Sequence, residues 1–221
     1  MARQAGCSAV TITDVDAGRV KYAIERGFAT NGFVVPDPMH SCSGSSNNSG
    51  TSTPLDSGVM TPASTLSFSS QFDGAKSLAN EILSLTKTPD ALLDDEDDGV
   101  DVTFECTGKE VCMRTSLYAT RPGGKVIMVG MGTPIQTLPM SVAHLREVDI
   151  LGIFRYANTY ATGIRLLCAQ GKGGAGFTLP SLDDMVTHRF KGLGAAKGAF
   201  ELASRTVDDN GKLVLKVVIE A

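Results

Sequence analysis

Hydrophobic and polar residues follow two different periods along this chain. Five runs are rich in β-branched and apolar residues, as is typical of strands: TITD, FVV, VDVTFEC, GGKVIMVGMG and DILGIFRY. The segments between them place apolar residues at helical spacing: AGRVKYAIERG, SLANEILSL, EVCMRTSLYATR and TYATGIRLLCAQG. Towards the C-terminus, VTHRF, GAAKGAFELAS and KLVLKVVIEA predict a strand, a helix and a final strand. Strands that alternate with helices predict an α/β fold with a parallel sheet and helices on both faces.

One stretch, residues 37–75, breaks this alternation. It is crowded with Ser, Thr, Gly, Asn and Pro, and such a composition buries too little apolar surface to offset the entropy lost on ordering. We therefore predict a disordered insertion over 37–75. The acidic run at 94–98 is expected to stay solvated, because its carboxylates lack the interleaved spacing of a calcium-binding loop.

Composition and charge exclude several classes of function. The chain has 221 residues, a formal net charge of -4 and no cluster of Lys and Arg of the kind that nucleic-acid binding requires. No apolar run approaches the roughly 18 residues needed to span a bilayer. The five cysteines form no C-x-x-C pair and the three histidines are scattered, so we expect no metal site within this chain. Free thiols of this kind indicate a reducing, cytoplasmic location.

The dinucleotide-binding pattern G-x-G-x-x-G is matched at residues 171–176, but its context is wrong. The fingerprint requires a strand before it and a helix after it, so that a pyrophosphate meets the helix N-terminus. Here the glycines follow a predicted helix, and we interpret them as a flexible turn.

Asp14 is a better candidate for cofactor binding. It ends a β-rich run directly before a helix, and in a doubly wound sheet a carboxylate after the second strand accepts hydrogen bonds from the ribose of a dinucleotide. It would also repel a 2′-phosphate, which favours NAD over NADP. The alternative role is helix capping, for which Asp16 competes because it directly precedes the helix. Arg19 is either a solvated helix residue or a lid over the adenine.

Three turns follow predicted strands at one edge of the sheet: residues 106–108, 130–132 and 154–156. The carboxyl ends of the strands form the ligand crevice in open α/β sheets. Glycines at two of these turns would let a planar ring approach the backbone closely. Cys106, in the first turn, is expected to be a small core residue, since no histidine lies nearby in sequence to activate it.

Several motifs together resemble one enzyme family. TDVDAGRVKYA, DVTFECTG, GGKVIMVGMG, REVDILGIFRYANTY and MVTHRF, in this order, resemble the C-terminal half of the zinc-dependent medium-chain dehydrogenases, and within them the sorbitol and xylitol dehydrogenase group. The resemblance implies a Rossmann-like, doubly wound parallel sheet that binds NAD. It also implies oxidation of a secondary alcohol of a sugar alcohol to a ketose by hydride transfer. In the family, a zinc ion in a separate N-terminal domain polarises the substrate hydroxyl.

The resemblance further implies a set of site residues. Asp14 and Arg19 would hold the adenosine ribose, and Arg155 and Tyr156 would reach the polyol hydroxyls. The cofactor groove and the nicotinamide half would be lined by Thr107, Val129, Gly130, Met131, Ile153 and Phe154. No catalytic or metal-ligating residue is carried over onto this chain.

The chain departs from the family pattern at its N-terminus. MARQAGC matches the end of the family's first Rossmann helix, so the first strand, the Gly-rich turn and the zinc ligands are missing. We expect an N-terminally truncated sheet in which 1–36 and 76–185 form a partial NAD-binding domain. Residues 186–221 correspond to a segment that in the family packs on the absent catalytic domain. Loss of the first strand would leave backbone groups unpaired in the middle of the sheet.

Three hypotheses follow for the function. The first makes the chain the cofactor-domain portion of an NAD-dependent polyol dehydrogenase, inactive by itself. The second makes it a non-catalytic cofactor-binding or oligomerisation module, and the third a truncated gene product. The expected partners are a small polyol and a second polypeptide, either another copy or a full-length relative, with neither nucleic acid nor a membrane.

Overall fold

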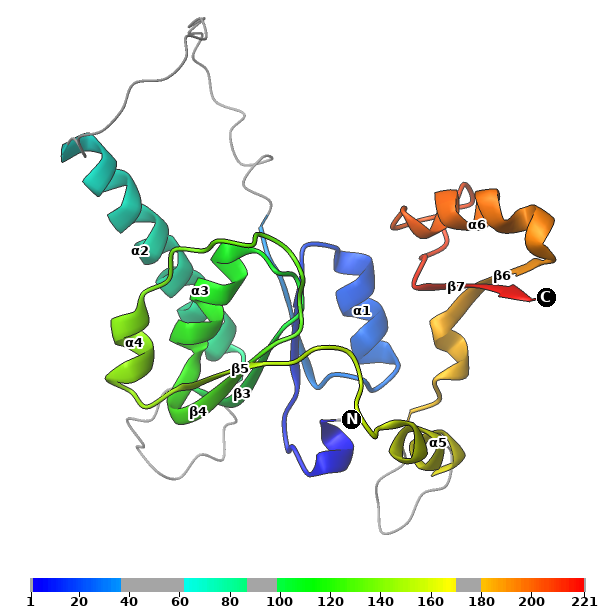
Figure 1. The fold of residues 1–221 in the computed structure, drawn as a ribbon, viewed down its shortest axis with the longest axis horizontal. Coiled ribbons are helices and arrows are strands. Elements are labelled where there is room, and N and C mark those ends of the chain that lie inside the picture. The colour runs from blue at the N-terminus through cyan, green and yellow to red at the C-terminus, as the bar shows by residue number, and fades with distance from the viewer. Residues whose placement is uncertain (1, 37–61, 87–98, 170–179, 221) are drawn as a thin grey trace, which may run out of the picture. The chain divides into compact units, whose positions relative to one another are not determined.

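The computed structural model describes residues 2–36, 62–86, 99–169 and 180–220 (Figure 1). Contacts divide the chain into two units: unit 1 combines Met1–Ser41 with Tyr156–Ala221, and unit 2 is Cys42–Arg155. Both units contain parallel β-strands joined by α-helices, which confirms the predicted α/β, Rossmann-like fold. Within the described ranges, no helix is both long enough and apolar enough to cross a membrane.

The N-terminal part of unit 1 is a β-α-β motif. Its elements are β1 (Thr11–Asp14), α1 (Ala17–Glu25) and β2 (Asn31–Val34). β1 and β2 pair in parallel, with Asp14 opposite Val34 at the carboxyl ends. α1 buries Val20 and Ala23, which lie on one helical face. The chain returns to β2 through Gly27, whose positive φ ends the helix.

The C-terminal part of unit 1 contains a second strand–helix–strand motif. Its elements are α5 (Tyr160–Ala169), β6 (Val186–Lys191), α6 (Ala196–Ala203) and β7 (Lys216–Glu220). β6 and β7 pair in parallel, and the connection between them runs through α6. The predicted final strand is shorter than its apolar pattern, because Leu213 forms an isolated antiparallel bridge with Val207 before β7 begins.

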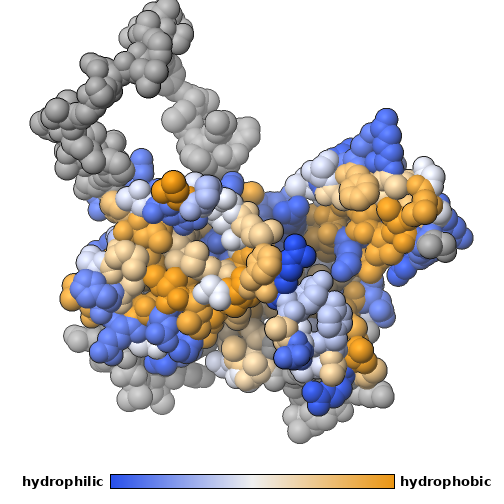
Figure 2. All heavy atoms as spheres, in the orientation of Figure 1, coloured by the Kyte–Doolittle hydropathy of each residue, from blue (hydrophilic) through white to orange (hydrophobic). Residues whose placement is uncertain are grey.

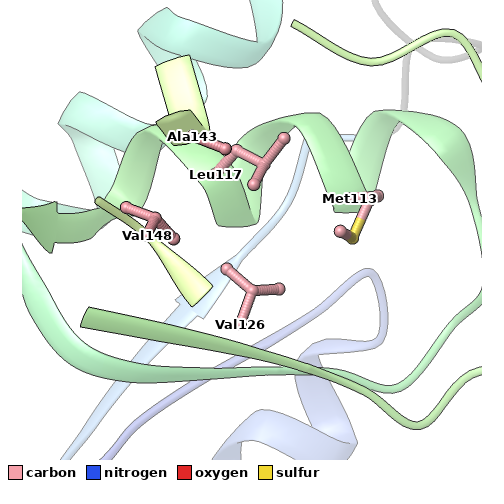
Figure 3. Packing of buried hydrophobic residues seen from close by; sticks show 5 residues of the cluster. All are labelled: Met113, Leu117, Val126, Ala143 and Val148. Atoms are coloured by element: carbon pink, nitrogen blue, oxygen red, sulfur yellow. The ribbon is translucent and has the colours of Figure 1, made fainter. Parts of the chain in front are cut away.

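Unit 2 is a three-stranded parallel sheet covered by helices. Its elements are α2 (Pro62–Ser84), β3 (Val100–Glu105), α3 (Glu110–Ala119), β4 (Thr120–Met128), α4 (Met140–His144) and β5 (Asp149–Gly152). The strand order is β3-β4-β5, and Phe104, Ile127 and Leu151 lie side by side across it. The core forms between α3, β4 and α4; it consists of Met113, Leu117, Val126, Ala143 and Val148 (Figure 3).

Part of the predicted insertion is helical. α2 begins at Pro62, and Ala75 is 1% exposed, so the end of the range 37–75 packs against the fold. The reason is that Phe72, Ala75 and Ala79 follow helical spacing, a pattern obscured by the surrounding serines. Residues 37–61 and the acidic run at 94–98 lie outside the described residues.

The described strands pair within their own units. In unit 1, β1 is paired with β2, and in unit 2, β3 is paired with β4. Among the described strands of its own unit, each of β1 and β3 is therefore an edge strand.

Candidate functional site

Two carboxylates lie at the end of β1, and they do different things. Asp16 is the N-cap of α1, and its side chain accepts a hydrogen bond from the backbone N–H of Arg19 at 2.9 Å. The Asp14 carboxylate accepts the backbone N–H of Asp16 at 2.9 Å and lies 3.8 Å from the Arg19 guanidinium. The capping role therefore belongs to Asp16. Asp14 keeps a partly exposed carboxylate at the carboxyl end of the strand, next to a cation.

The turn after β3 is organised by the side chain of Glu105. This carboxylate is buried, with 4% of the residue exposed. It accepts the backbone N–H of Thr107 at 2.8 Å and that of Gly108 at 2.9 Å, and it also accepts the Thr107 hydroxyl. The Thr107 hydroxyl in turn accepts the backbone N–H of Lys109 at 3.0 Å. Thr107 is thus held in a fixed turn at the carboxyl end of β3.

The loop after β4 is hydrogen-bonded to this turn. The backbone N–H of Gly130 donates to the carbonyl of Glu105 at 2.9 Å. The carbonyl of Gly108 accepts the N–H of Thr133 and the side-chain amide of Gln136, each at 3.2 Å. The two connections therefore form one connected surface at the ends of β3 and β4.

Glycine is required where the two connections meet. Gly108 has a φ of 72°, in the left-handed region that L side chains rarely adopt. A Cβ on Gly108 would lie 2.3 Å from the backbone nitrogen of Gly132, and one on Gly130 would lie 2.1 Å from the nitrogen of Gly108. Backbone therefore packs directly on backbone, and no side chain fits between.

Exposed apolar side chains follow directly after β4 and β5. β4 ends at Met128 and β5 at Gly152, so these side chains stand at the carboxyl ends of the strands. Their exposed fractions are 41% for Val129, 84% for Met131, 51% for Ile153 and 75% for Phe154. Figure 2 shows apolar surface over the body that carries α2, α3 and α4 in Figure 1. An exposed apolar group at a strand end is a common mark of a ligand-binding surface.

Arg155 and Tyr156 lie in an irregular connection. The prediction of a strand through residue 156 is wrong, because pairing with β4 stops at Gly152. Arg155 has a φ of 56°, and its guanidinium lies 5.1 Å from the centre of the Phe154 ring. The Tyr156 ring packs edge-on against Tyr160, with 5.1 Å between ring centres.

The candidate residues fall into the two units. In unit 2, Thr107 lies at the same end of the sheet as the exposed apolar residues after β4 and β5. These residues are Val129, Met131, Ile153 and Phe154. In unit 1, Asp14 ends β1, and Arg19 lies beside it in the first turn of α1. Tyr156 belongs to the same unit and precedes α5. Sequence reasoning missed Glu105 and Gln136. The available sign for Glu105 was its place at the end of the strand VDVTFE, because a carboxylate that is buried there needs hydrogen-bond donors.

Comparison with known proteins gives matches over part of the chain. Residues 65–169 match the family model described as zinc-binding dehydrogenase. Sorbitol dehydrogenase from chicken is 41% identical over 116 residues, which is 52% of this chain and 30% of that enzyme. The human sorbitol dehydrogenase is 42% identical over 101 residues, 46% of this chain and 26% of that enzyme. These matches support the zinc-dependent medium-chain dehydrogenase family. It spans less than a third of the curated relatives that it matches.

Solved dehydrogenases share the fold over most of the chain. A zinc-dependent alcohol dehydrogenase from Streptococcus superimposes with a TM-score of 0.61 at 18% identity, covering 96% of this chain and 44% of that one. At this identity the similarity shows the fold alone. It nevertheless agrees with the parallel strands of both units.

The family name implies zinc, and the described residues do not fit it. Nowhere among them do three His, Cys, Asp or Glu side chains gather into a group that could hold a metal ion. Cys106 is exposed, so the expectation of a core residue is wrong. Partial desolvation of its thiol, and secondarily the charge of Glu105, raises the pKa of Cys106, whereas zinc binds the thiolate. The G-x-G-x-x-G match at 171–176 lies outside the described residues.

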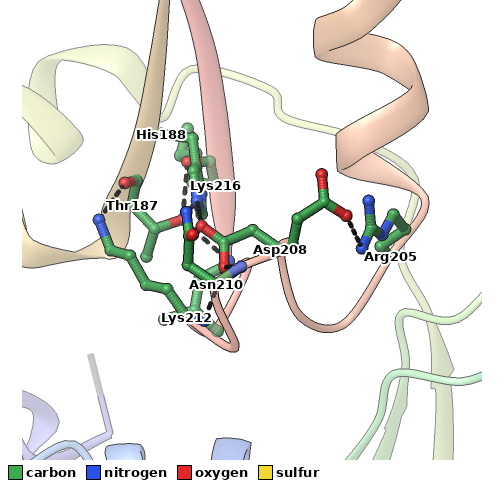
Figure 4. Close-up of polar contacts among 9 residues, drawn as sticks. Thr187, His188, Arg205, Asp208, Asn210, Lys212 and Lys216 are labelled. Carbon is green, nitrogen blue, oxygen red and sulfur yellow. Dashed lines mark hydrogen bonds and ion pairs between the residues drawn. The ribbon is translucent and has the colours of Figure 1, made fainter.

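A cavity in the C-terminal part of unit 1 carries a second polar cluster. It has a volume of about 340 Å³ and is lined by His188, Phe190, Gly198, Glu201, Leu202, Arg205, Asp208, Asp209 and Asn210. Figure 4 shows Asp208 as its centre: the carboxylate accepts the backbone N–H of Lys212 at 2.7 Å and of Asn210 at 2.9 Å. His188 Nε2 lies 3.2 Å from the other carboxylate oxygen. The cluster ties the turn before β7 to β6.

Asp208 should make unit 1 sensitive to acid. The hydrogen bond from Lys212, followed by those from His188 and Asn210, holds the pKa of the Asp208 carboxyl below its usual range. Its ionised form therefore stabilises the fold above the ordinary value of about 4, and this contribution is lost as the pH falls through the lower folded-state pKa. Asp208→Asn is expected to lower stability at pH 7 and to flatten the dependence of stability on pH below about pH 4.

Urea unfolding between pH 2.5 and 7 measures this effect. Asp209→Asn removes the same charge from a side chain that is 87% exposed and pairs only with Arg205 at the surface, so it is the matched control. Identical pH profiles for the two variants would contradict the assignment.

Proposed function

We propose that this chain forms the cofactor-binding part of an NAD-dependent polyol dehydrogenase, which oxidises a secondary alcohol of a sugar alcohol to a ketose. Its similarity to sorbitol dehydrogenases supports the polyol class. The observation that carries the cofactor assignment is the separation of roles at β1: Asp16 caps the helix, and Asp14 is left at the strand end. A cytoplasmic location is part of the proposal and is supported by the scattered cysteines, of which the described ones are free thiols.

Each unit by itself presents residues that suit one part of a dinucleotide. A carboxylate such as Asp14 accepts hydrogen bonds from both ribose hydroxyls, and Arg19 beside it can cover the adenine. The exposed apolar residues after β4 and β5 offer a non-polar surface for the nicotinamide half, and Thr107 is held in the turn after β3 in the same unit. When bound, the nicotinamide ring supplies the hydride acceptor for the reaction.

Arg155 and Tyr156 are proposed to contact the polyol. A guanidinium offers several donors in a rigid fork, which suits adjacent hydroxyl groups on a sugar alcohol. Tyr156 is 61% exposed and presents a hydroxyl close by in sequence. A second polypeptide, either another copy or a full-length relative, completes the proposed enzyme. NADH production from sorbitol by the chain alone and with such a partner separates this proposal from a non-catalytic module.

Changing Asp14 to alanine should weaken NAD binding. The variant loses the proposed hydrogen bonds to the ribose. Because the acceptor is charged, this loss should weaken the binding free energy by on the order of 1–3 kcal/mol. The variant also loses the negative charge that disfavours a 2′-phosphate, so the ratio of NADP to NAD affinity should rise. Titration of both dinucleotides by calorimetry measures the two effects.

Asp16→Ala is the matched control, two residues away. As the N-cap it should lower the free energy of unfolding by about 1 kcal/mol and leave the choice between NAD and NADP unchanged. If Asp16→Ala relaxes the choice of cofactor and Asp14→Ala does not, the placement of the ribose is wrong. The outcome also tests the proposed function, because a wild-type chain that binds neither dinucleotide refutes it.

A further inference from the structure

We propose that Glu105 is a positioning residue that builds one edge of the dinucleotide crevice, an inference that rests on the proposed function. Its side chain fixes the turn after β3, and its main chain anchors the loop after β4. Thr107, Gly130 and Met131 would then reach their cofactor-binding positions only through Glu105. Glu105 itself would not touch the cofactor, because its carboxylate is buried beneath the turn.

The first step of the argument concerns the side chain. The two carboxylate oxygens accept two backbone N–H groups and one hydroxyl, all from Thr107 and Gly108. A carboxylate has only acceptors, so every one of these contacts is satisfied. Glutamine has nearly the same shape but replaces one oxygen with an NH2 group. In Glu105→Gln, a donor would face the backbone N–H of Thr107 or Gly108, and the turn would have to shift.

The second step concerns the main chain of the same residue. The carbonyl of Glu105 accepts the N–H of Val129 at 2.7 Å and that of Gly130 at 2.9 Å. The start of the loop after β4 is thus hydrogen-bonded to the Glu105 carbonyl, while the turn after β3 is hydrogen-bonded to the Glu105 carboxylate. One residue therefore sets the relative position of both connections.

The third step concerns the contact between the turn after β3 and the loop after β4, which is too close for either backbone to move toward the other. A Cβ on Gly108, Gly130 or Gly132 would meet backbone atoms at 2.1–2.3 Å, so backbones are already in direct contact there. The Gly108 carbonyl also holds the loop through Thr133 and Gln136. A shift of Gly108 would therefore be passed to residues 130–136 instead of being absorbed locally.

The test compares Glu105→Gln with Asp101→Asn in the 221-residue chain. Asp101 lies on the same strand, and its carboxylate is 80% exposed, so its variant removes one charge without touching the turn. Hydrogen exchange measures the backbone amides of the turn and loop against those of the core helix α3. Fluorescence titration measures NADH affinity, and AMP serves as a probe for the Asp14 side alone.

In Glu105→Gln, we expect exchange at Thr107, Gly108 and Gly130 to rise by about tenfold, the scale of one lost hydrogen bond to a charged group, with α3 unchanged. NADH affinity should fall about tenfold, and AMP affinity should stay the same. Asp101→Asn should change none of these quantities.

Three results would overturn the inference. Unchanged exchange in the turn refutes the geometric role, and unchanged NADH affinity in a wild type that binds NADH refutes the functional one. Equal loss of protection in α3 shows that Glu105 only stabilises the fold. A wild-type chain that does not bind NADH refutes the proposed function instead, and the exchange data still decide whether Glu105 holds the two connections together.

Discussion

Replacing Gly108 with alanine should destabilise unit 2 by roughly 2–5 kcal/mol, the sum of a left-handed backbone penalty and overpacking against a fixed neighbour. Gly108 has a φ of 72°, and its new Cβ would lie within 2.7 Å of three backbone atoms of residues 131 and 132. Backbone cannot rotate out of the way as a side chain can. The turn after β3 and the loop after β4 must therefore separate, and the surface proposed for the nicotinamide half should open with them. Urea unfolding and NADH titration measure the two consequences.

Gly123→Ala is the matched control for this change. Gly123 has a φ of 69°, but a Cβ there would meet no atom within 4 Å. It should cost only the backbone penalty of about 1–2 kcal/mol and leave NADH affinity unchanged. Equal losses in the two variants would mean that the contact between the connections contributes nothing.

Replacing Arg114 with methionine should cost about 1–3 kcal/mol, the range for leaving hydrogen-bond acceptors of a buried side chain without their donor. The Arg114 side chain is 4% exposed and pairs with Glu110. Its guanidinium also donates to the carbonyl of Thr137 and to the side chain of Gln71, each at 2.9 Å, and lies 4.7 Å from the centre of the Phe72 ring. Methionine fills the space but leaves these acceptors without a donor. Urea unfolding of the variant measures the loss, and α2 should exchange its amides faster.

Arg121→Met provides the comparison. Arg121 pairs with Asp101 at 2.9 Å, but its side chain is 45% exposed, so the loss should stay below about 1 kcal/mol. If Arg114→Met costs no more than Arg121→Met, the Arg114 network does not hold α2 to α3.

Boundaries set by neighbouring residues could be predicted from the sequence, and those set by distant partners could not. β1 ends at Asp14 and α1 starts after Asp16, because a strand end and an N-cap are local features. DILGIFRY contains large apolar residues on both sides of Gly152, yet β5 stops at Gly152, which pairs with Met128, the last residue of β4. The start of α2 was hidden for a different reason: its helical spacing lies within a Ser-rich composition.

The candidate site shows the same contrast. Asp14 and the glycines after the strands could be found, since each depends on its place next to a strand end. Gln136 could not, because its partner Gly108 lies 28 residues away and meets it only in the folded unit. The roles of these residues in binding cofactor and substrate remain predictions.

At Arg155, selection for thermal stability and selection for activity should favour different residues. A φ of 56° costs an arginine about 1–3 kcal/mol, and glycine or asparagine adopts it more cheaply. In a library that holds all twenty residues at this position, growth at high temperature alone would enrich glycine and asparagine. If Arg155 contacts the polyol as proposed, growth on a polyol through a complete enzyme that contains this chain would recover arginine from the same library. The arginine found here would then be the mark of a chain whose ancestors were selected for turnover at the expense of heat resistance.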